Sequence, residues 1–375
     1  MRTLFALLLG LACWMMACTP SGKRIASGEP RSVDSVRYAR GFTIQRFDDY
    51  TQVEVRDPWD SVRLLRRYLL VDRTRPLPAG LPQGTVVRVP ARDVVVYTSV
   101  HAAIIDQLGE AGRIIGVCEP RYMETPVIQE GLRAGRVADL GEATAPNVER
   151  MIEIGAELVI ASPFENSGYG PVEKIGIPII EGADYMESSP LGRTEWIRFY
   201  GLLFGQEKRA DSLFRETERA YLSLKTLAAD VAERPTVFSE KKYGSSWYMP
   251  AGDSYMARLY ADAGADYVFK TLPGSGSTPL AFERVLEQAI HADYWLLKYN
   301  QSADLTYQGL RMEYTPYEHF DAFRDRRIYA CNTGKVPYYE EFPLHPDYLL
   351  KDLIWIFHPE LLPEYLPRYF RRMAE

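Results

Sequence analysis

The chain has 375 residues, of which 46% are hydrophobic and 25% charged, and its 44 Lys and Arg against 50 Asp and Glu give a formal net charge of −6. This length and composition are typical of globular domains and allow two domains with full cores. The negative charge argues against a general nucleic-acid binder, so we expect no nucleic-acid partner. With 25 Tyr and only 5 His, the chain favours aromatic stacking surfaces, and we expect no His-rich metal site.

The N-terminal segment indicates export. An apolar run from Leu4 to Met16 follows the positive charge of Arg2 and ends at a small residue before Cys18. The run is shorter than the ~20 residues of a membrane-spanning helix, so residues 1–17 are predicted to be a signal peptide. The Ala-Cys junction resembles a bacterial lipoprotein cleavage site, which would leave Cys18 as the lipidated N-terminus; a plain secretory signal is the alternative.

The next segments differ in character. Residues 18–36 are rich in Ser, Gly, Pro and charge and are predicted to form a lipidated flexible tether. Residues 37–92 contain short stretches in which apolar and polar residues alternate, as in half-buried strands. We expect this N-terminal extension to be a small antiparallel sheet that packs on the domain after it.

From residue 93 the pattern changes to short apolar strands between helical segments, which predicts a parallel sheet covered on both faces. This first α/β lobe spans 93–205. Residues 206–234 have helical apolar spacing and are predicted to form one long rigid connecting helix of roughly 40 Å. A second α/β series occupies 235–375.

Two further observations concern both halves. Asn147–Ala161 and Ala281–Leu297 each contain a predicted short helix with Glu-Arg in its first turn, followed by a buried strand. This similarity suggests an internal repeat.

Cys118 and Cys331 fall in different halves of the chain. We expect both to be free buried thiols, and a disulfide between them is the alternative that an oxidising compartment permits.

The lipoprotein signal, the two α/β lobes, the long helix and the paired Glu-Arg helices together resemble the substrate-binding proteins of ABC importers for cobalamin, ferric siderophores and haem. The resemblance covers about 93–360, and its best-matching stretches are 94–109, 138–150 and 189–196. It implies two Rossmann-like lobes joined by the helix, with the β-rich extension as an addition. It also implies a monomer in the bacterial cell envelope, facing the periplasm or at the cell surface.

The resemblance further implies a permease partner in the inner membrane. In the family, an exposed Glu on each lobe docks onto Arg residues of the permease, and by position these are Glu149 and Glu283. The alternative is that each Glu merely complements the positive end of its helix dipole.

Ligands of open α/β sheets bind at the carboxyl ends of the strands, which face each other across a two-lobed cleft. Trp247 and Tyr248 offer rings for stacking on a planar ligand; the alternative is that either ring fills the core. Arg193 is a partner for an anionic group or else forms a salt bridge to Glu195 or Glu187, and His101 is either a ligand of haem iron or a hydrogen-bonding cap. The complete set of candidate ligand-binding residues is Ser99, His101, Glu142, Thr144, Phe164, Asn166, Tyr185, Arg193, Trp196, Trp247, Tyr248 and Tyr299.

These features predict a binding protein for a metal chelate, with iron chelates (ferric siderophore or haem) ahead of cobalamin. We expect no enzyme activity, no catalytic residue and no resident cofactor, because the sequence lacks Gly-x-Ser-x-Gly, His-Glu-x-x-His, Cys-x-x-Cys and a phosphate-binding loop. A hydrolase or chelatase-like enzyme and a surface lipoprotein that hands a chelate to another receptor remain as alternatives of other classes.

Overall fold

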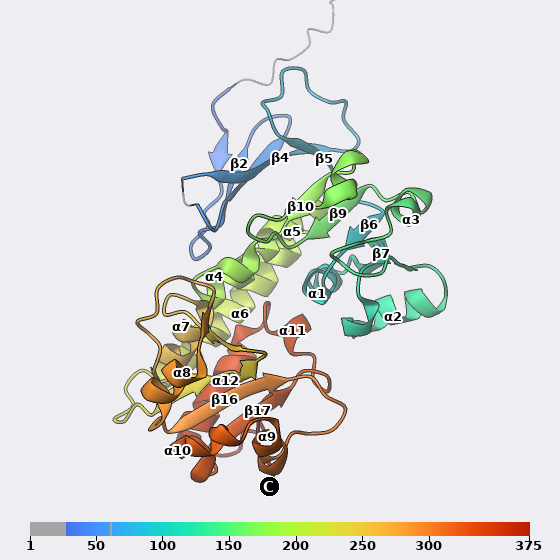
Figure 1. Ribbon diagram of the computed structural model, residues 1–375. Helices are drawn as coiled ribbons and strands as arrows, with labels where there is room; N and C mark the ends of the chain where they lie inside the picture. The colour runs from blue at the N-terminus through green and yellow to red at the C-terminus, as the bar shows by residue number, and fades with distance from the viewer. Residues whose placement is uncertain (1–27, 61) are drawn as a thin grey trace, which may run out of the picture.

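The computed structural model describes residues 28–60 and 62–375. Figure 1 shows an upper part formed by the extension and the first lobe, and a lower part formed by the second lobe, with α5 and α6 running between them. This is the α/β fold with two lobes and an N-terminal β-rich extension that the sequence predicts. Signal residues 1–17, Cys18 and the tether residues up to 27 lie outside the described residues, and the predicted tether is wrong for Ser32–Val33, which form a strand. No helix in the described part of the chain is long and apolar enough to cross a membrane.

The extension is a five-stranded sheet in the order β1-β2-β3-β4-β5. Its strands are β1 Ser32–Val33, β2 Phe42–Arg46, β3 Thr51–Arg56, β4 Leu64–Asp72 and β5 Thr85–Val89. The expectation of a purely antiparallel sheet is wrong at one pair, because β5 runs parallel to β4.

The connection between β4 and β5 explains the parallel pair. It crosses the outer face of the sheet, where Leu81 packs against buried Leu69 and Val71. The inner face, with Phe42 and Tyr68, joins the core of the first lobe. The extension is therefore packed on the lobe that follows it, as the sequence indicates.

The first lobe contains an all-parallel sheet in the order β10-β9-β6-β7-β8. Its strands are β6 Val94–Val96, β7 Ile114–Val117, β8 Ala138–Asp139, β9 Leu158–Ala161 and β10 Ile179–Glu181. Its α-helices are α1 Ser99–Gln107, α2 Pro126–Arg133, α3 Val148–Glu153, α4 Pro190–Glu195 and α5 Ile197–Phe204, and its 3₁₀ turns include η3 Gly170–Lys174 and η4 Asp184–Met186. β6 is fully buried, as a strand covered on both faces must be.

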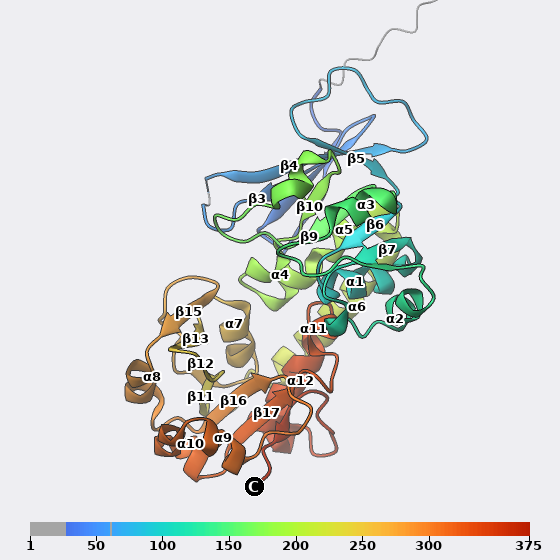
Figure 2. The same cartoon turned by 45° about the vertical axis from the view of Figure 1, so that its right-hand side comes forward.

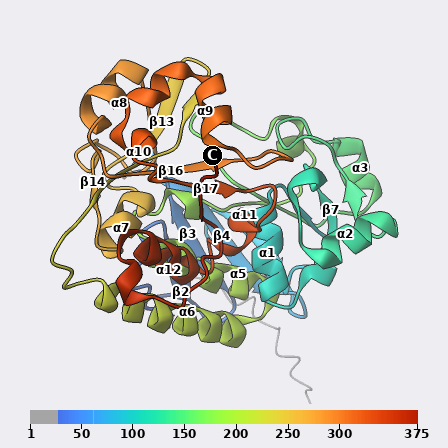
Figure 3. The same cartoon turned by 90° about the horizontal axis from the view of Figure 1, so that it is seen from below.

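The connecting helix α6 spans Glu207–Leu227, so the predicted helical range of 206–234 is wrong for its last residues. The chain turns at Ala228, which is fully buried, and the residue before Pro235 is disfavoured in helical conformation. At 1.5 Å per residue α6 is roughly 30 Å long. Its Phe214 belongs to the core of the first lobe and its Tyr221 to the core of the second. Figure 3 shows α6 along one edge of the molecule, where it contacts α5 and α12.

The second lobe has a main sheet in the order β14-β11-β16-β17-β18, parallel except for β18, and a smaller antiparallel sheet β12-β13-β15. The strands are β11 Thr236–Ser239, β12 Lys242–Tyr243, β13 Ser246–Pro250, β14 Asp266–Tyr267, β15 Ser277–Leu280, β16 Tyr294–Tyr299, β17 Ile328–Asn332 and β18 Arg371–Arg372. The helices are α7 Tyr255–Asp262, α8 Phe282–Ala289, α9 Tyr307–Glu313, α10 Asp321–Arg324, α11 Tyr338–Glu341 and α12 Pro346–Phe357.

The two lobes repeat one strand order. In each main sheet the first strand (β6 or β11) has the next strand of that sheet (β7 or β14) on one side and the strand after α3 or α8 (β9 or β16) on the other. The short helices with Glu-Arg therefore precede equivalent strands. Cys118 and Cys331 are both free and buried, in separate cores, so no disulfide joins the lobes.

Candidate ligand-binding cleft

A cavity of about 750 Å³ lies at the carboxyl ends of β11 and β16. The second lobe supplies most of its wall, from the segments that follow these strands, from β13 and from the start of α7. The first lobe contributes Tyr185 and Met186 of η4, and α11 adds Tyr339. Six tyrosines line this cleft cavity: Tyr185, Tyr243, Tyr248, Tyr255, Tyr299 and Tyr339.

A second hollow of about 670 Å³ lies at the carboxyl ends of β6 and β9 in the first lobe. Its lining includes Tyr97, Thr144, Phe164 and Tyr169. The rings of Phe164 and Tyr185 lie 6.2 Å apart between centroids. Since Phe164 lines the first-lobe hollow and Tyr185 lines the cleft cavity, the two spaces meet at this aromatic pair.

The charges in the cleft cavity are three lysines against one glutamate among the lining residues. Lys298 pairs with Glu240. Burial alone would lower the pKa of Lys298, but the charge of Glu240 raises it well above its ordinary value, so Lys298 stays protonated. Lys241 pairs with Glu313. Lys242 donates to the carbonyl of Gly244 at 2.6 Å and lies 5.0 Å from the ring centroid of Tyr314, with no carboxylate partner among the described residues. The wall is therefore electropositive.

Four of the candidate ligand-binding residues are buried and line neither the cleft cavity nor the first-lobe hollow. The Trp247 side chain is fully buried against Trp295 and donates Nε1–H to the carbonyl of Ser239 at 2.9 Å. Trp196 is fully buried against Phe42, 4.9 Å between ring centroids. The prediction of ligand contact is wrong for both, because each ring fills a core position.

His101 is the third buried residue. It is 0% exposed, its backbone N–H donates to the Thr98 hydroxyl at 3.3 Å as part of the N-cap of α1, and its Nε2 lies 3.7 Å from Asp184. The capping interpretation, the alternative to an iron ligand, matches this geometry. Arg193 is 9% exposed and pairs with the same Asp184 at 3.1 Å, a different carboxylate from the two that the sequence suggested.

His101, Asp184 and Arg193 form a buried charged cluster next to the residues that line the cleft cavity. Burial alone would raise the pKa of Asp184, but His101 and Arg193 hold it below its ordinary value. The Arg193 guanidinium also lies 5.1 Å from the ring centroid of Tyr255, which lines the cavity.

The remaining candidates divide between the two spaces and the surface. Tyr185, Tyr248 and Tyr299 line the cleft cavity, and Thr144 and Phe164 line the first-lobe hollow. Three others line neither of them: Ser99 is the half-buried first residue of α1, Glu142 is exposed and paired with Arg121 at 2.8 Å, and Asn166 is exposed in a turn.

The structure adds residues that the list of candidates omitted, chiefly Tyr255, Tyr339, Lys298 and Glu240. Lys298 and Glu240 each stand at the carboxyl end of a strand. Because ligands of open α/β sheets bind at these ends, the sequence pattern was sufficient to predict both residues. Tyr255 and Tyr339 lie on helices, and no strand end pointed to them.

Glu149 and Glu283 are exposed in the first turns of α3 and α8. In each helix the following Arg pairs with the Glu three residues later, Arg150 with Glu153 at 2.6 Å and Arg284 with Glu287 at 3.3 Å. Neither Glu149 nor Glu283 has an ion-pair partner among residues 28–60 and 62–375. Both carboxylates are therefore free at matching places of the two lobes.

Comparison with known proteins agrees with this geometry. The profile of the periplasmic binding protein family matches residues 94–333, and the chain belongs to this family. An uncharacterized lipoprotein of Methanocaldococcus jannaschii is 25% identical over 395 residues, covering 94% of this chain and 93% of the relative. That alignment includes most of the extension, which lies outside the family match.

Two solved structures have the same fold. IsdE of S. aureus, complexed with haem, has a TM-score of 0.57 and 18% identity and covers 72% of this chain and 99% of its own. A protein of an ABC-type Fe3+-hydroxamate transport system from Saccharomonospora viridis has a TM-score of 0.55 and 18% identity, over 71% of this chain and 93% of its own. No three His, Cys, Asp or Glu side chains gather as a metal site within the described ranges 28–60 and 62–375.

Proposed function

We propose that this chain is the substrate-binding lipoprotein of an ABC importer, which captures an iron chelate (a ferric siderophore or haem) in the cleft between its lobes and delivers it to a membrane permease. The observation that carries the proposal is the cleft cavity of about 750 Å³, lined by six tyrosines and by three lysines against one glutamate. Cavities of roughly 300–1,000 Å³ hold small organic ligands. The haem-bound and hydroxamate-transport neighbours support the same class of ligand.

The chemistry of the wall suits an anionic chelate with flat apolar parts. Tyrosine rings stack on planar groups with little loss of conformational entropy, and their hydroxyls donate to carboxylate or hydroxamate oxygens. Lys242, which has no carboxylate partner among the described residues, supplies a positive charge. This excess of positive charge favours haem or an anionic siderophore complex over cobalamin.

Delivery rests on Glu149 and Glu283. Two free carboxylates at matching positions of the lobes would align the binding protein on a basic permease surface and raise the rate of their association. Lipidation of Cys18 holds the binding protein, as a monomer, at the envelope membrane beside the permease.

Uptake in cells that depend on this chain tests the proposal. The double variant Glu149→Arg/Glu283→Arg should abolish uptake of the chelate and leave binding by the purified protein unchanged. The matched control Glu153→Arg/Glu287→Arg reverses two charges one turn further along the same helices and should retain uptake. Unchanged uptake by the first variant would contradict permease docking and favour a hand-over lipoprotein.

A further inference from the structure

Five consecutive backbone N–H groups of the extension, those of residues 37–41, donate to two buried carboxylates of the first lobe. Glu195 accepts from Arg37, Tyr38 and Ala39, at 2.7 Å for Tyr38. Glu187 accepts from Arg40 at 3.0 Å and from Gly41 at 2.8 Å. Glu195 is fully buried and Glu187 is 4% exposed. Residues 37–41 are called the clamp below.

The clamp lies so close to the lobe that glycine is required at two places. A Cβ on Gly41 would stand 2.8 Å from the Trp196 ring and 3.0 Å from the Glu187 carboxylate. A Cβ on Gly192 of α4 would stand 3.0 Å from the Tyr38 carbonyl oxygen and 3.2 Å from Glu187. Side chains at either place would push the clamp away from the carboxylates that hold it.

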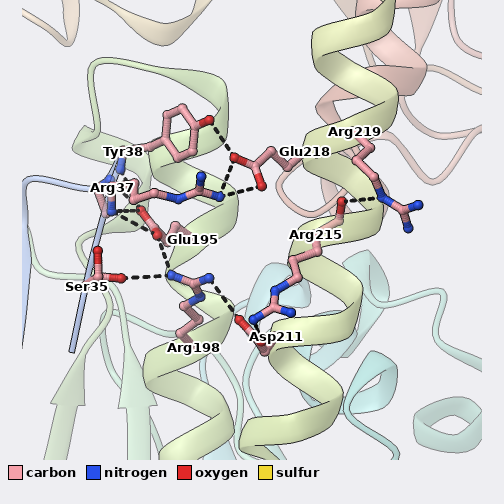
Figure 4. A network of polar contacts seen from close by, with 10 residues as sticks. Ser35, Arg37, Tyr38, Glu195, Arg198, Asp211, Arg215, Glu218 and Arg219 are labelled. Atoms are coloured by element: carbon pink, nitrogen blue, oxygen red, sulfur yellow. Dashed lines mark hydrogen bonds and ion pairs between the residues drawn. The ribbon is translucent and has the colours of Figure 1, made fainter.

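A third carboxylate extends the contact to the connecting helix. Glu218 of α6 accepts from Tyr38 Oη at 2.6 Å and from the Arg37 guanidinium at 2.5 Å (Figure 4). Arg198 of α5 bridges Glu195 at 2.7 Å and Asp211 of α6 at 2.9 Å in the same network. The Tyr38 ring packs against the cores of both lobes. In Figure 2, α4 lies between the extension and α7 of the second lobe.

The segment held in this way carries the first-lobe wall of the cleft cavity. Glu187 directly follows Tyr185 and Met186, the two first-lobe residues that line the cavity. The Trp196 indole N–H also donates to Glu187, at 2.8 Å. Without the clamp, Glu187 would keep only that indole donor. Burial already raises the pKa of Glu187 because it disfavours the charged carboxylate. Losing the clamp donors would therefore leave a buried carboxylate with too few hydrogen bonds, which is costly. The loop of residues 184–187 would then shift to hydrate Glu187.

We propose that the clamp is a positioning element for ligand binding: residues 37–41 fix Glu187 and thereby set the place of Tyr185 and Met186 in the cavity. This gives the N-terminal extension a role in affinity, and it rests on the proposed function of the cavity as the chelate site. Gly41 and Glu187 are positioning residues, since neither lines the cavity.

A double-mutant cycle tests the proposal on the purified full chain in detergent micelles. Gly41→Ala adds one methyl group at the crowded contact, and Gly28→Ala, whose Cβ would meet nothing within 4 Å, is the matched control. With haemin or a ferric hydroxamate as probe, Gly41→Ala should weaken binding by about tenfold and Gly28→Ala should not change it. In a Tyr185→Ala/Met186→Ala background, Gly41→Ala should weaken binding by less than about twofold, because both side chains that the clamp positions are gone. An equal loss in both backgrounds, or no loss, overturns the proposal.

A second readout needs no ligand and so separates this proposal from the function of the cavity. The amides of Met186 and Glu187 bond to the carbonyls of Ala183 and Asp184 at 3.0 and 3.1 Å. Gly41→Ala should speed hydrogen exchange at these two amides and leave exchange at the Trp295 amide of β16 unchanged. If Gly41→Ala does not fold, the same exchange measurement is made on Glu187→Gln. Unchanged exchange at 186–187 overturns the proposal, whereas faster exchange in a protein that binds no chelate would leave the clamp standing and refute the proposed function.

Discussion

Tyr185 and Phe164 stand where the cleft cavity and the first-lobe hollow meet, with ring centroids 6.2 Å apart. Tyr185 is held in place by a 2.5 Å hydrogen bond from its hydroxyl to the carbonyl of Pro163. The pair comes from loops after β9 and β10, neighbouring strands of the first lobe. A ligand in the cleft cavity would therefore contact the Tyr185 ring, which is held by its hydrogen bond to Pro163 and by its packing against Phe164.

Replacing this ring should weaken ligand binding. Tyr185→Ala removes the stacking surface and opens the junction of the two spaces, and we expect chelate affinity to fall by about ten- to a hundredfold. Tyr122→Ala is the control, because Tyr122 is 52% exposed and lines neither space. Fluorescence titration of both variants measures the effect, and equal affinities would contradict the assignment of this wall.

Removing the negative partner of Lys298 in the cleft cavity should strengthen ligand binding. Glu240→Gln removes the carboxylate that pairs with Lys298, so the negative group of an anionic ligand can take its place as the partner that keeps the buried ammonium protonated. Haemin affinity should rise by about three- to tenfold at low salt and the gain should shrink at 1 M salt. Glu287→Gln, at a surface pair on α8, should change nothing. Weaker binding by Glu240→Gln would mean that the Glu240–Lys298 pair is required intact.

A buried acid in α12 predicts a pH dependence of stability. Burial raises the pKa of Asp347 from 3.8 to about 6, and its Oδ1 has no hydrogen-bond partner among the described residues. The native state therefore holds this proton more tightly than the unfolded state, and stability falls as pH rises from about 4 through about 6. Asp347→Asn should flatten that fall and add about 1–3 kcal/mol to the free energy of unfolding at pH 7. Urea unfolding at pH 4.5 and 7 checks it; equal gains at both values would contradict it.

The connecting helix predicts small lobe motion. Phe214 and Tyr221 lie on the one helix α6 and belong to the cores of different lobes. Bending α6 between them would break continuous backbone hydrogen bonds, so free and ligand-bound crystals should differ by a small rotation. A rotation of tens of degrees would contradict this account.

Much of the fold follows from local sequence pattern. Continuous apolar strands such as Val94–Val96 predicted the parallel sheets, and the absence of Gly and Pro in residues 206–233 predicted α6. The site was less predictable. Adjacent residues of a strand face opposite sides, so only one of Trp247 and Tyr248 could face the cleft. The packing of the Trp247 ring against Phe238 and Trp295 of the main sheet decides that it is Tyr248.

The clamp shows what no local pattern could reveal. Gly41 and Glu187 are 146 residues apart in the chain, and their contact depends on backbone N–H groups that every residue type except proline carries. Glu187 and Glu195 look like ordinary surface acids of a helical segment until the extension is folded onto them. Their burial comes from tertiary packing alone.

A direct binding titration tests the central claim. The purified chain is titrated with haemin, a ferric hydroxamate and cyanocobalamin, followed by absorbance and thermal shift. Saturable binding of one iron chelate at micromolar or tighter affinity is the predicted result, with stabilisation of about 2.7 kcal/mol at a hundredfold ligand excess over Kd. Tight binding of cyanocobalamin alone would contradict the iron chelate, and no binding of any of the three would contradict the chelate site.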